Sequence, residues 1–417
     1  MASLIPLTYL LIISFLFLHS SNASFVLPII KDNTKSQYYT TFQVGTSPST
    51  RVYLSIDLGN KFSWFACNLY GYKTRSSQEI PCDSPKCSLY TGPTSFCSGS
   101  ACGALAYTPW GDGLYGDSLY EDTTSLYKQT LEKIYLRKFP FTCADKGPLK
   151  GLSPHTKGVV SLARVPLSLH SQISSTLKVP RKFSLCLPST SSFGYNGAMY
   201  FGSSPDYISK SLIKTPLIIN PNSTSPISSR GESSIEHFIK VKSIKVDGTS
   251  ARFSTSLLSF DKNGIGGTKI STFDSYTVLQ TDIYKALINV FVTKANRMKM
   301  TRVASVAPFG ACFSNVIDSK LGPIVPIIDF ILDGKSPLLH NKNARWRIYG
   351  ANSMVKVSKS VWCLGFVDGG SEPTTSIVIG GKQMEDNLVE FDLESSMLGV
   401  TSSLLRKRTS CSTFKGI

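Results

Sequence analysis

After residue 23 the sequence contains no apolar run long enough to cross a bilayer, so no later segment is expected to anchor the chain in a membrane. Acidic side chains are also scarce: 27 Asp and Glu stand against 44 Lys and Arg, which gives a formal net charge of +17 at pH 7. Such a surface attracts acidic partner proteins or pectin-like acidic polysaccharides.

The one long apolar stretch lies in residues 1–23, MASLIPLTYLLIISFLFLHSSNA. A short apolar middle followed by the small residues at 21–23 is typical of a secretory signal peptide, although no Lys or Arg precedes it. We therefore expect a secreted protein with a mature chain that begins near Ser24. Outside the cell, nucleic acid is a poor explanation for the basic surface, so we expect no nucleic-acid partner.

The ten cysteines all follow the expected signal peptide, and an even number in an exported chain predicts five disulfides. A zinc site in the cluster Cys82, Cys87, Cys97 and Cys102 is the competing interpretation. The cluster has two CxxxxC spacings but lacks nearby His ligands, so we expect neither a metal nor another cofactor. Spacing alone does not decide how these four cysteines pair.

From Tyr38 onward, short runs rich in β-branched and aromatic residues, such as YYTTFQVG and TSIVIGG, alternate with Gly, Pro, Asn and Ser clusters. This pattern predicts an all-β protein, with helical spacing mainly at residues 281–298. The length suits two domains, which we place at residues 24–206 and 207–417. The polar runs 189–196 and 220–232 are expected to be exposed connections, and Asn222 begins a glycosylation sequon.

The segment IDLGNKFSWFAC places Asp57 at the end of a predicted strand, and Trp64 follows seven residues later. It resembles the Asp-Thr-Gly-Ser turn of pepsin-like aspartic proteases, in which glycine permits the turn and a hydroxyl orients the carboxylate. Leu58 removes that hydroxyl. The run TPWGDGLYGD resembles the hairpin that covers the cleft of these proteases, but Trp110 replaces its tyrosine, so we expect an altered cleft.

An aspartic protease needs a second Asp, because two carboxylates share one proton and activate water. Two registers compete in GGTKISTFDSYTVLQTDIY. Asp274 imitates the second motif, but Tyr276 would then occupy the turn glycine. Counting back from the anchor TVL instead lands on Ser271, which we prefer. Serine cannot replace the carboxylate, so Asp57 and Ser271 are vestigial positions and the protein is not expected to be an enzyme.

Segments such as GGTKIST, CLGFVDGG and SIVIGGKQMEDNLVEFDL resemble a plant group of inactive aspartic-protease homologues: extracellular dermal glycoproteins, basic 7S globulins and xyloglucan-endoglucanase inhibitors. The resemblance implies an all-β, bilobal pepsin-like fold of the xylanase-inhibitor type with a few short helices, secreted into the extracellular space, apoplast or cell wall. It further implies inhibition of microbial glycoside hydrolases, above all family-12 xyloglucan-specific endo-β-1,4-glucanases. The alternative is a binding or storage globulin that captures a peptide or wall polymer.

In the inhibitory relatives, two basic residues from loops of the C-terminal lobe enter between the catalytic carboxylates of the target. The matching positions here are Lys320, an Arg in the relatives, and Arg408; Arg406 and Lys407 are equally possible contacts. Lys320 keeps the charge but loses the bidentate fork of Arg. The resemblance also implies three disulfides, namely Cys312–Cys363, Cys186–Cys411 and Cys67–Cys143.

Overall fold

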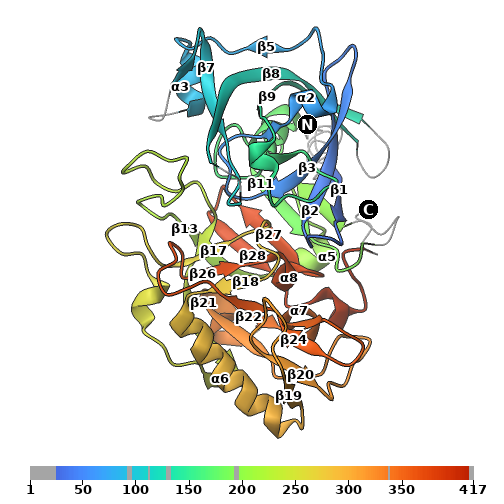
Figure 1. Ribbon diagram of the computed structural model, residues 1–417, viewed down its shortest axis with the longest axis vertical. Helices are drawn as coiled ribbons and strands as arrows, with labels where there is room; N and C mark the ends of the chain where they lie inside the picture. The colour runs from blue at the N-terminus through green and yellow to red at the C-terminus, as the bar shows by residue number, and fades with distance from the viewer. Residues whose placement is uncertain are drawn as a thin grey trace, which may run out of the picture.

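The computed structural model describes residues 25–91, 96–110, 113–127, 133–191, 197–336 and 339–412, and the expected signal peptide lies outside these ranges. Two lobes, each built mainly of strands, are stacked along the long axis of the molecule (Figure 1). The prediction of an all-β, bilobal fold with few helices is therefore confirmed. The boundary between the lobes at residue 206 stays a prediction.

The elements in the first part of the chain are short, except for the long hairpin of β8 and β9. Their bounds are β1 (Phe25–Lys31), β2 (Tyr38–Val44), β3 (Thr50–Asp57), β4 (Trp64–Phe65), α2 (Cys67–Tyr70), β5 (Gln78–Glu79), α3 (Pro85–Thr91), β6 (Cys97–Ser98), β7 (Ala101–Ala106), β8 (Tyr115–Tyr127), β9 (Lys133–Cys143), η2 (Gly147–Leu149), β10 (Gly158–Ser161), α4 (Leu169–Leu177), β11 (Lys182–Cys186), β12 (Gly197–Phe201) and α5 (Asp206–Ser209).

The second part of the chain carries the one long helix. Its elements are β13 (Ile213–Ile218), β14 (Phe238–Ile239), β15 (Val241–Val246), β16 (Thr249–Ser250), η3 (Thr255–Leu258), β17 (Thr268–Ile270), β18 (Thr277–Leu279), α6 (Thr281–Arg297), β19 (Thr301–Val303), β20 (Cys312–Ser314), β21 (Ile328–Ser336), β22 (Leu339–Ile348), α7 (Gly350–Ser353), β23 (Met354–Lys356), β24 (Trp362–Leu364), β25 (Phe366–Asp368), β26 (Ile377–Ile379), α8 (Gly381–Met384), β27 (Leu388–Asp392), β28 (Met397–Val400) and η4 (Leu404–Lys407).

A central antiparallel sheet joins the two lobes. Its strands run in the order β1, β12, β11, β27, β28 and β13, so that β11 from the first part of the chain pairs with β27 near its end. The register places Phe183 opposite Phe391, and their rings stack with centroids 4.6 Å apart. Nearly all residues of strands β11 and β12 are buried, as expected for a sheet that is covered on both faces.

Helix α6 confirms the helix expected from apolar spacing at residues 281–298. Its buried residues, Ile283, Leu287, Phe291 and Ala295, recur every four positions and so form one face. The side chain of Gln280 caps the first turn by accepting hydrogen bonds from the N–H groups of residues 282 and 283. The helix contacts β15, β19 and β25 at the far end of the C-terminal lobe (Figure 1).

Five disulfides connect all ten cysteines. Cys67–Cys143, Cys186–Cys411 and Cys312–Cys363 are the three pairs that the resemblance implies, and Cys82–Cys97 and Cys87–Cys102 are the two pairs that spacing left open. The Cys186–Cys411 bond ties the C-terminal segment to β11 of the central sheet. Among the described residues, no group of His, Cys, Asp and Glu has the arrangement of a metal site. None of the described helices has the length and apolar character needed to cross a membrane.

Candidate functional site

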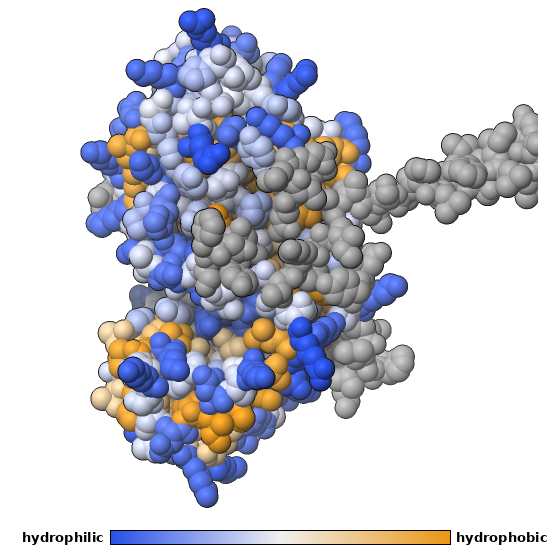
Figure 2. Space-filling view, turned by 90° about the vertical axis from the view of Figure 1, so that its right-hand side faces the viewer, coloured by the Kyte–Doolittle hydropathy of each residue, from blue (hydrophilic) through white to orange (hydrophobic). Residues whose placement is uncertain are grey.

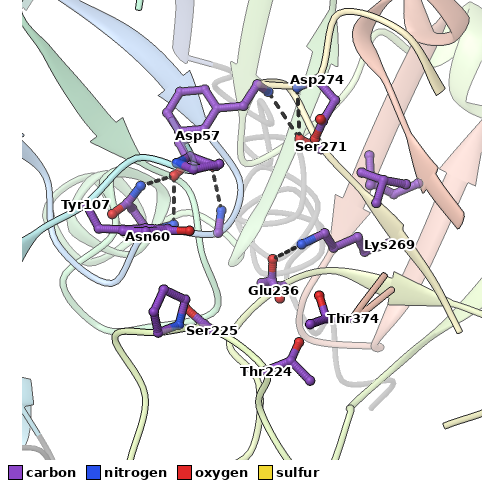
Figure 3. A pocket seen from close by; sticks show the side chains of 16 residues that line it. Asp57, Asn60, Tyr107, Thr224, Ser225, Glu236, Lys269, Ser271, Asp274 and Thr374 are labelled. Atoms are coloured by element: carbon purple, nitrogen blue, oxygen red, sulfur yellow. Dashed lines mark hydrogen bonds and ion pairs between the residues drawn. The ribbon is translucent and has the colours of Figure 1, made fainter. Parts of the chain in front are cut away.

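Asp57 ends strand β3, which lies parallel to β10, and its side chain is 6% exposed. The carboxylate accepts hydrogen bonds from the backbone N–H groups of Gly59 and Asn60, both at 2.9 Å, and from the side-chain amide of Asn60 (Figure 3). A turn that offers N–H donors from the second and third following residues holds the carboxylate in one orientation at the interface between the lobes.

Ser271 follows β17, which lies parallel to β26, so the C-terminal lobe repeats the arrangement around Asp57. The hydroxyl of Ser271 accepts hydrogen bonds from the N–H groups of Phe273 and Asp274, both at 3.2 Å. These donors are again the second and third following residues. Ser271 and Asp57 line the same cavity of about 260 Å³, and Asp274 lines it too (Figure 3).

One hydrogen bond connects the two turns across the lobes. Thr272 donates its hydroxyl proton to the backbone carbonyl of Ile56 at 2.6 Å, and Thr272 is buried. The residue after Asp57 is Leu58, which is buried but has no hydroxyl with which to form the reciprocal bond. Because residue 58 has no hydroxyl, as the sequence predicts, the turn of Asp57 donates no matching hydrogen bond to the C-terminal lobe.

The hairpin of β7 and β8 brings Trp110 onto the turn that follows Ser271. The rings of Trp110 and Phe273 lie with centroids 5.3 Å apart, and both residues belong to a cluster that includes buried Trp64. The indole N–H of Trp64 has no hydrogen-bond partner among the described residues. Trp110, which stands in place of the hairpin tyrosine of the proteases, packs across the cleft. Its indole has only an N–H donor, so it cannot accept a hydrogen bond from the buried N–H of Trp64.

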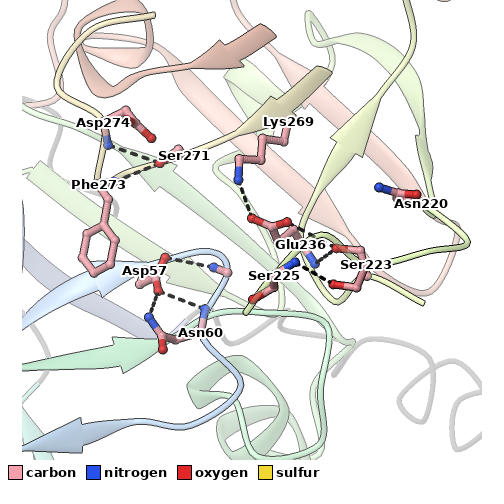
Figure 4. A network of polar contacts seen from close by, with 12 residues as sticks. Asp57, Asn60, Asn220, Ser223, Ser225, Glu236, Lys269, Ser271, Phe273 and Asp274 are labelled. Carbon is pink, nitrogen blue, oxygen red and sulfur yellow. Dashed lines mark hydrogen bonds and ion pairs between the residues drawn. The ribbon is translucent and has the colours of Figure 1, made fainter. Parts of the chain in front are cut away.

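The polar run 220–232 connects β13 to β14 as expected, but it is only partly exposed: residues 221, 226, 230 and 231 are exposed, and most of the others are half-buried. Ile227 is buried, Glu232 forms an ion pair with Lys61 at 3.3 Å, and Thr224 and Ser225 line the cavity. Hydrogen bonds within the run order it: Ser223 accepts from the N–H of Ser225 and from the hydroxyl of Ser228, and the carboxylate of Glu232 accepts from the N–H of residue 229 (Figure 4 shows Ser223 and Ser225). The amide of Asn222, which is half-buried, donates a hydrogen bond to the carbonyl of residue 262.

Sequence reasoning missed two charged residues of the cavity, Glu236 and Lys269, which form an ion pair at 2.7 Å (Figure 4). Glu236 packs against the turn of Asp57, since a side chain on Gly59 would meet its Oε1 at 3.3 Å. No local motif marks this pair, because residues 236 and 269 come together only when β14 pairs with β17.

The pKa of the Asp57 carboxyl is raised to about 6: burial is the largest cause and the nearby charge of Glu236 adds to it, whereas the hydrogen bonds from Asn60 and Gly59 limit the rise. Burial also raises the pKa of Asp274. For Lys269, burial alone would lower the pKa, but the ion pair with Glu236 raises it above its usual value. Of the two turns, only that of the N-terminal lobe therefore begins with a carboxyl, Asp57, because Ser271 in the equivalent place does not ionise in this range.

Replacing Asp57 with Asn is expected to change how stability depends on pH. The folded chain holds the Asp57 proton up to about pH 6 and the unfolded chain only to about 3.8, so the stability of the wild type falls as pH rises between these values. The uncharged amide lacks this fall, so the stability of the variant relative to the wild type should be about 1–3 kcal/mol higher at pH 7 than at pH 4. Urea unfolding at pH 4 and pH 7 measures the difference; an equal difference at both pH values would contradict the prediction.

Lys320 and Arg408 lie away from this cavity, on exposed loops of the C-terminal lobe. Lys320 belongs to the loop between β20 and β21, and Arg408 ends η4 in the left-handed conformation with φ at 58°. Ser319 and residues 321–324 of the first loop and Arg406 of the second line one cavity of about 270 Å³, with Lys320 beside it in sequence. The two loops are therefore neighbours, although nearly ninety positions separate them along the sequence.

Two family models match the chain: Xylanase inhibitor N-terminal over residues 38–203 and Xylanase inhibitor C-terminal over residues 236–402. The chain belongs to the xylanase-inhibitor family. Among curated proteins, this family member is 40% identical to "Probable aspartic proteinase GIP2" of Nicotiana benthamiana over 446 residues, with 99% of each chain covered.

Solved structures give the same result. The crystal structure of edgp matches with a TM-score of 0.87 and 39% identity, covering 94% of this chain and 98% of that one. Basic 7S globulin from soybean matches with a TM-score of 0.77 and 29% identity, covering 94% and 99%. The xylanase-inhibitor family and its globulin members support an inhibitor or globulin type of role, consistent with a protein that is not an enzyme.

Proposed function

We propose that this xylanase-inhibitor family member is a secreted inhibitor of microbial glycoside hydrolases, with family-12 xyloglucan-specific endoglucanases as the main targets. The observation that carries the proposal is the adjacency of two exposed loops that carry cationic side chains, one with Lys320 and one with Arg406, Lys407 and Arg408. Endoglucanases hold two carboxylates in an open cleft. A guanidinium or ammonium group placed between them satisfies both charges and excludes the substrate.

The loop of Lys320 has the composition of a docking surface. Ile317, Leu321 and Ile324 are 67%, 46% and 50% exposed, respectively, and apolar side chains gather on this lobe on the face that Figure 2 shows. Apolar residues around a central cation exclude water from the contact once a partner binds. Monomeric proteins seldom expose several apolar side chains together, so the exposed apolar residues of this loop support a site for binding a protein partner.

Hydrogen bonds within the loop keep Lys320 in place before binding. The N–H of Gly322 donates to the carbonyl of Ser319 at 2.9 Å, and the N–H of Ile324 donates to the carbonyl of Ile317 at 2.8 Å. Ser319 also donates its hydroxyl proton to the carbonyl of Gly322 at 2.6 Å. A loop already ordered in the free protein loses less conformational entropy when it binds, which favours affinity.

The arrangement around Ser271 supports the proposal that the protein has no protease activity. Ser271 accepts the same pair of backbone hydrogen bonds as Asp57, which favours the register in which serine stands where the second catalytic Asp would be. A single carboxyl cannot share a proton across the cleft. The contact between Trp110 and Phe273 covers the same region and hinders entry of a peptide.

The test is a titration of the purified protein into a family-12 xyloglucanase assay, with a family-11 xylanase in parallel. We expect xyloglucanase activity to fall near a stoichiometric ratio. Arg408→Ala should weaken inhibition by about thirtyfold or more, because removing one member of a buried charge pair costs about 2–5 kcal/mol. Lys320→Arg should strengthen it by restoring the bidentate fork.

Arg297→Ala is the matched control, because Arg297 is an exposed Arg at the end of α6 and lies on a different part of the lobe. It should inhibit as well as the wild type. If neither enzyme is inhibited, the proposal fails, and a globulin that binds a peptide or wall polymer becomes the better explanation.

Secretion and glycosylation at Asn222 belong to the same proposal, and mass spectrometry of the protein from plant extracellular fluid tests both.

A further inference from the structure

A second concave site lies where β22 meets the C-terminal segment, and it shares only Arg406 and Lys407 with the loops of the proposed function. Its volume is about 380 Å³, and four cationic side chains line it: Arg345, Arg347, Arg406 and Lys407. Hydroxyl groups from Ser211, Thr401, Ser402 and Ser403 and the ring of Tyr349 complete the lining. Four positive charges at one cavity repel one another unless an anion is bound there.

Strand β22 places two of these charges on one face. Arg345 and Arg347 are two residues apart and half-buried, whereas Ala344, Trp346 and Ile348 point into the core. Asp329 on the neighbouring strand β21 binds Arg347 through its Nε at 2.9 Å and through Nη2 at 3.4 Å, and it lies 3.6 Å from Nη1 of Arg345. This carboxylate, which is almost fully buried, neutralises one of the two guanidinium groups and fixes the direction of both.

The C-terminal segment supplies the other two charges from η4. The guanidinium of Arg406 lies over the ring of Tyr349, 4.7 Å from its centroid. The ammonium of Lys407 donates a hydrogen bond to the hydroxyl of Ser211 at 2.6 Å. Because the Cys186–Cys411 disulfide anchors this segment, both cations are positioned in the free protein, which reduces the ordering needed when a ligand binds.

The chemistry of the lining selects the ligand. A single small anion can contact only one or two of these cations, since residues 345 and 347 alone are about 7 Å apart along the strand. A chain with an anion on each unit can contact several. Ser402 accepts a hydrogen bond from the N–H of Arg347 at 3.1 Å and keeps its own proton free to donate. The mixture of guanidinium and hydroxyl groups fits a ligand with both carboxylates and hydroxyls.

We propose that this cavity binds an acidic oligosaccharide, a run of uronate residues, through Arg345, Arg347, Arg406 and Lys407. The carboxylates of successive sugars pair with the cations from β22 and η4, and sugar hydroxyls contact the serine hydroxyls. Binding of this kind holds the protein on an acidic polysaccharide. It is independent of the inhibition of a glycoside hydrolase through Lys320 and Arg408.

The test uses the mature chain, short unesterified galacturonate oligomers and isothermal titration calorimetry at low and physiological salt. The wild type should bind, and added salt should weaken binding because it screens the charges. The double variant Arg345→Gln/Lys407→Gln should bind about tenfold to a hundredfold more weakly, as expected from the loss of two charged hydrogen bonds. Arg347 is left unchanged, because its loss would leave the carboxylate of Asp329 poorly paired.

The matched control is Lys294→Gln/Arg297→Gln, which removes the same charge from α6 and should bind like the wild type. Should the first double variant fail to fold, Lys407→Gln alone serves, since that side chain is exposed and its loss should still weaken binding severalfold.

Equal binding of polyglutamate or of fully methyl-esterified oligomers would overturn the assignment to uronates. Equal competition by inorganic phosphate, or equal loss in both double variants, would overturn the site. Unchanged xyloglucanase inhibition by Arg345→Gln, a residue of β22 outside both inhibitory loops, together with weaker oligomer binding, would separate this site from those loops.

Discussion

Removal of the Cys186–Cys411 disulfide by alanine at both positions is expected to lower the free energy of unfolding by about 5 kcal/mol. The bond closes a loop with a sequence separation of 225 residues, so it restricts the unfolded chain more than any other disulfide of this protein. It also anchors the segment of Arg406 and Arg408. Loss of the bond should therefore also weaken xyloglucanase inhibition by about tenfold, because the segment must then be ordered on binding.

The control is alanine at Cys82 and Cys97, a bond that closes a loop of only 15 residues in the N-terminal lobe. This loss should cost about 3 kcal/mol and leave inhibition unchanged. Urea unfolding monitored by fluorescence gives the stability, and the xyloglucanase titration gives the affinity. If both variants lost inhibition equally, general destabilisation would explain the effect, and the anchoring role of Cys186–Cys411 would be rejected.

The second large effect is expected from Ser271→Asp. The new carboxylate would enter a cavity that already holds Asp57, Glu236 and Asp274 with only Lys269 as a cation, so the variant should be about 2–4 kcal/mol less stable than the wild type at pH 7. Repulsion raises the pKa of the new pair in the folded state above the unfolded value near 4. The stability deficit should therefore shrink as the pH falls below about 5.

We expect no proteolysis from this variant, since Trp110 stands in place of the hairpin tyrosine of the proteases and packs on Phe273, two residues after the new carboxylate. Cleavage of a fluorogenic peptide at mildly acid pH and urea unfolding at pH 4 and pH 7 measure the two expectations. Ser360→Asp, which adds the same charge at an exposed position, should leave stability and its pH dependence unchanged. Pepstatin-sensitive cleavage by Ser271→Asp would show that the hairpin admits a peptide and would contradict our account of the cleft.

The features that could be predicted from sequence are those with a local signal. The helix of residues 281–297 follows from apolar residues on one face, and the turn after Asp57 follows from a glycine at the end of a strand. In both cases neighbouring residues determine the conformation. The placement of Ser271 rests instead on the spacing to TVL in related proteases, and it stays a prediction.

The features that could not be predicted depend on distant contacts. The run 220–232 is polar, which is typical of an exposed connection, yet it packs in the cleft because Lys61 and the cavity offer partners. The ion pair of Glu236 and Lys269 requires strand pairing that no local pattern specifies. Similarly, the four cations of the second cavity come from residues 345–347 and 406–407, and only the tertiary fold brings them together.

The order of strands in the central sheet has a consequence for synthesis of the chain. Strand β11 is complete by residue 186, but its partner β27 begins at residue 388, about two hundred residues later. Until then, the nascent N-terminal lobe exposes an unpaired, apolar strand edge, the kind of surface on which chains aggregate. We therefore expect the nascent lobe to need protection of this edge until the rest of the chain has been translated, and we expect chains truncated before residue 388 to be prone to aggregation.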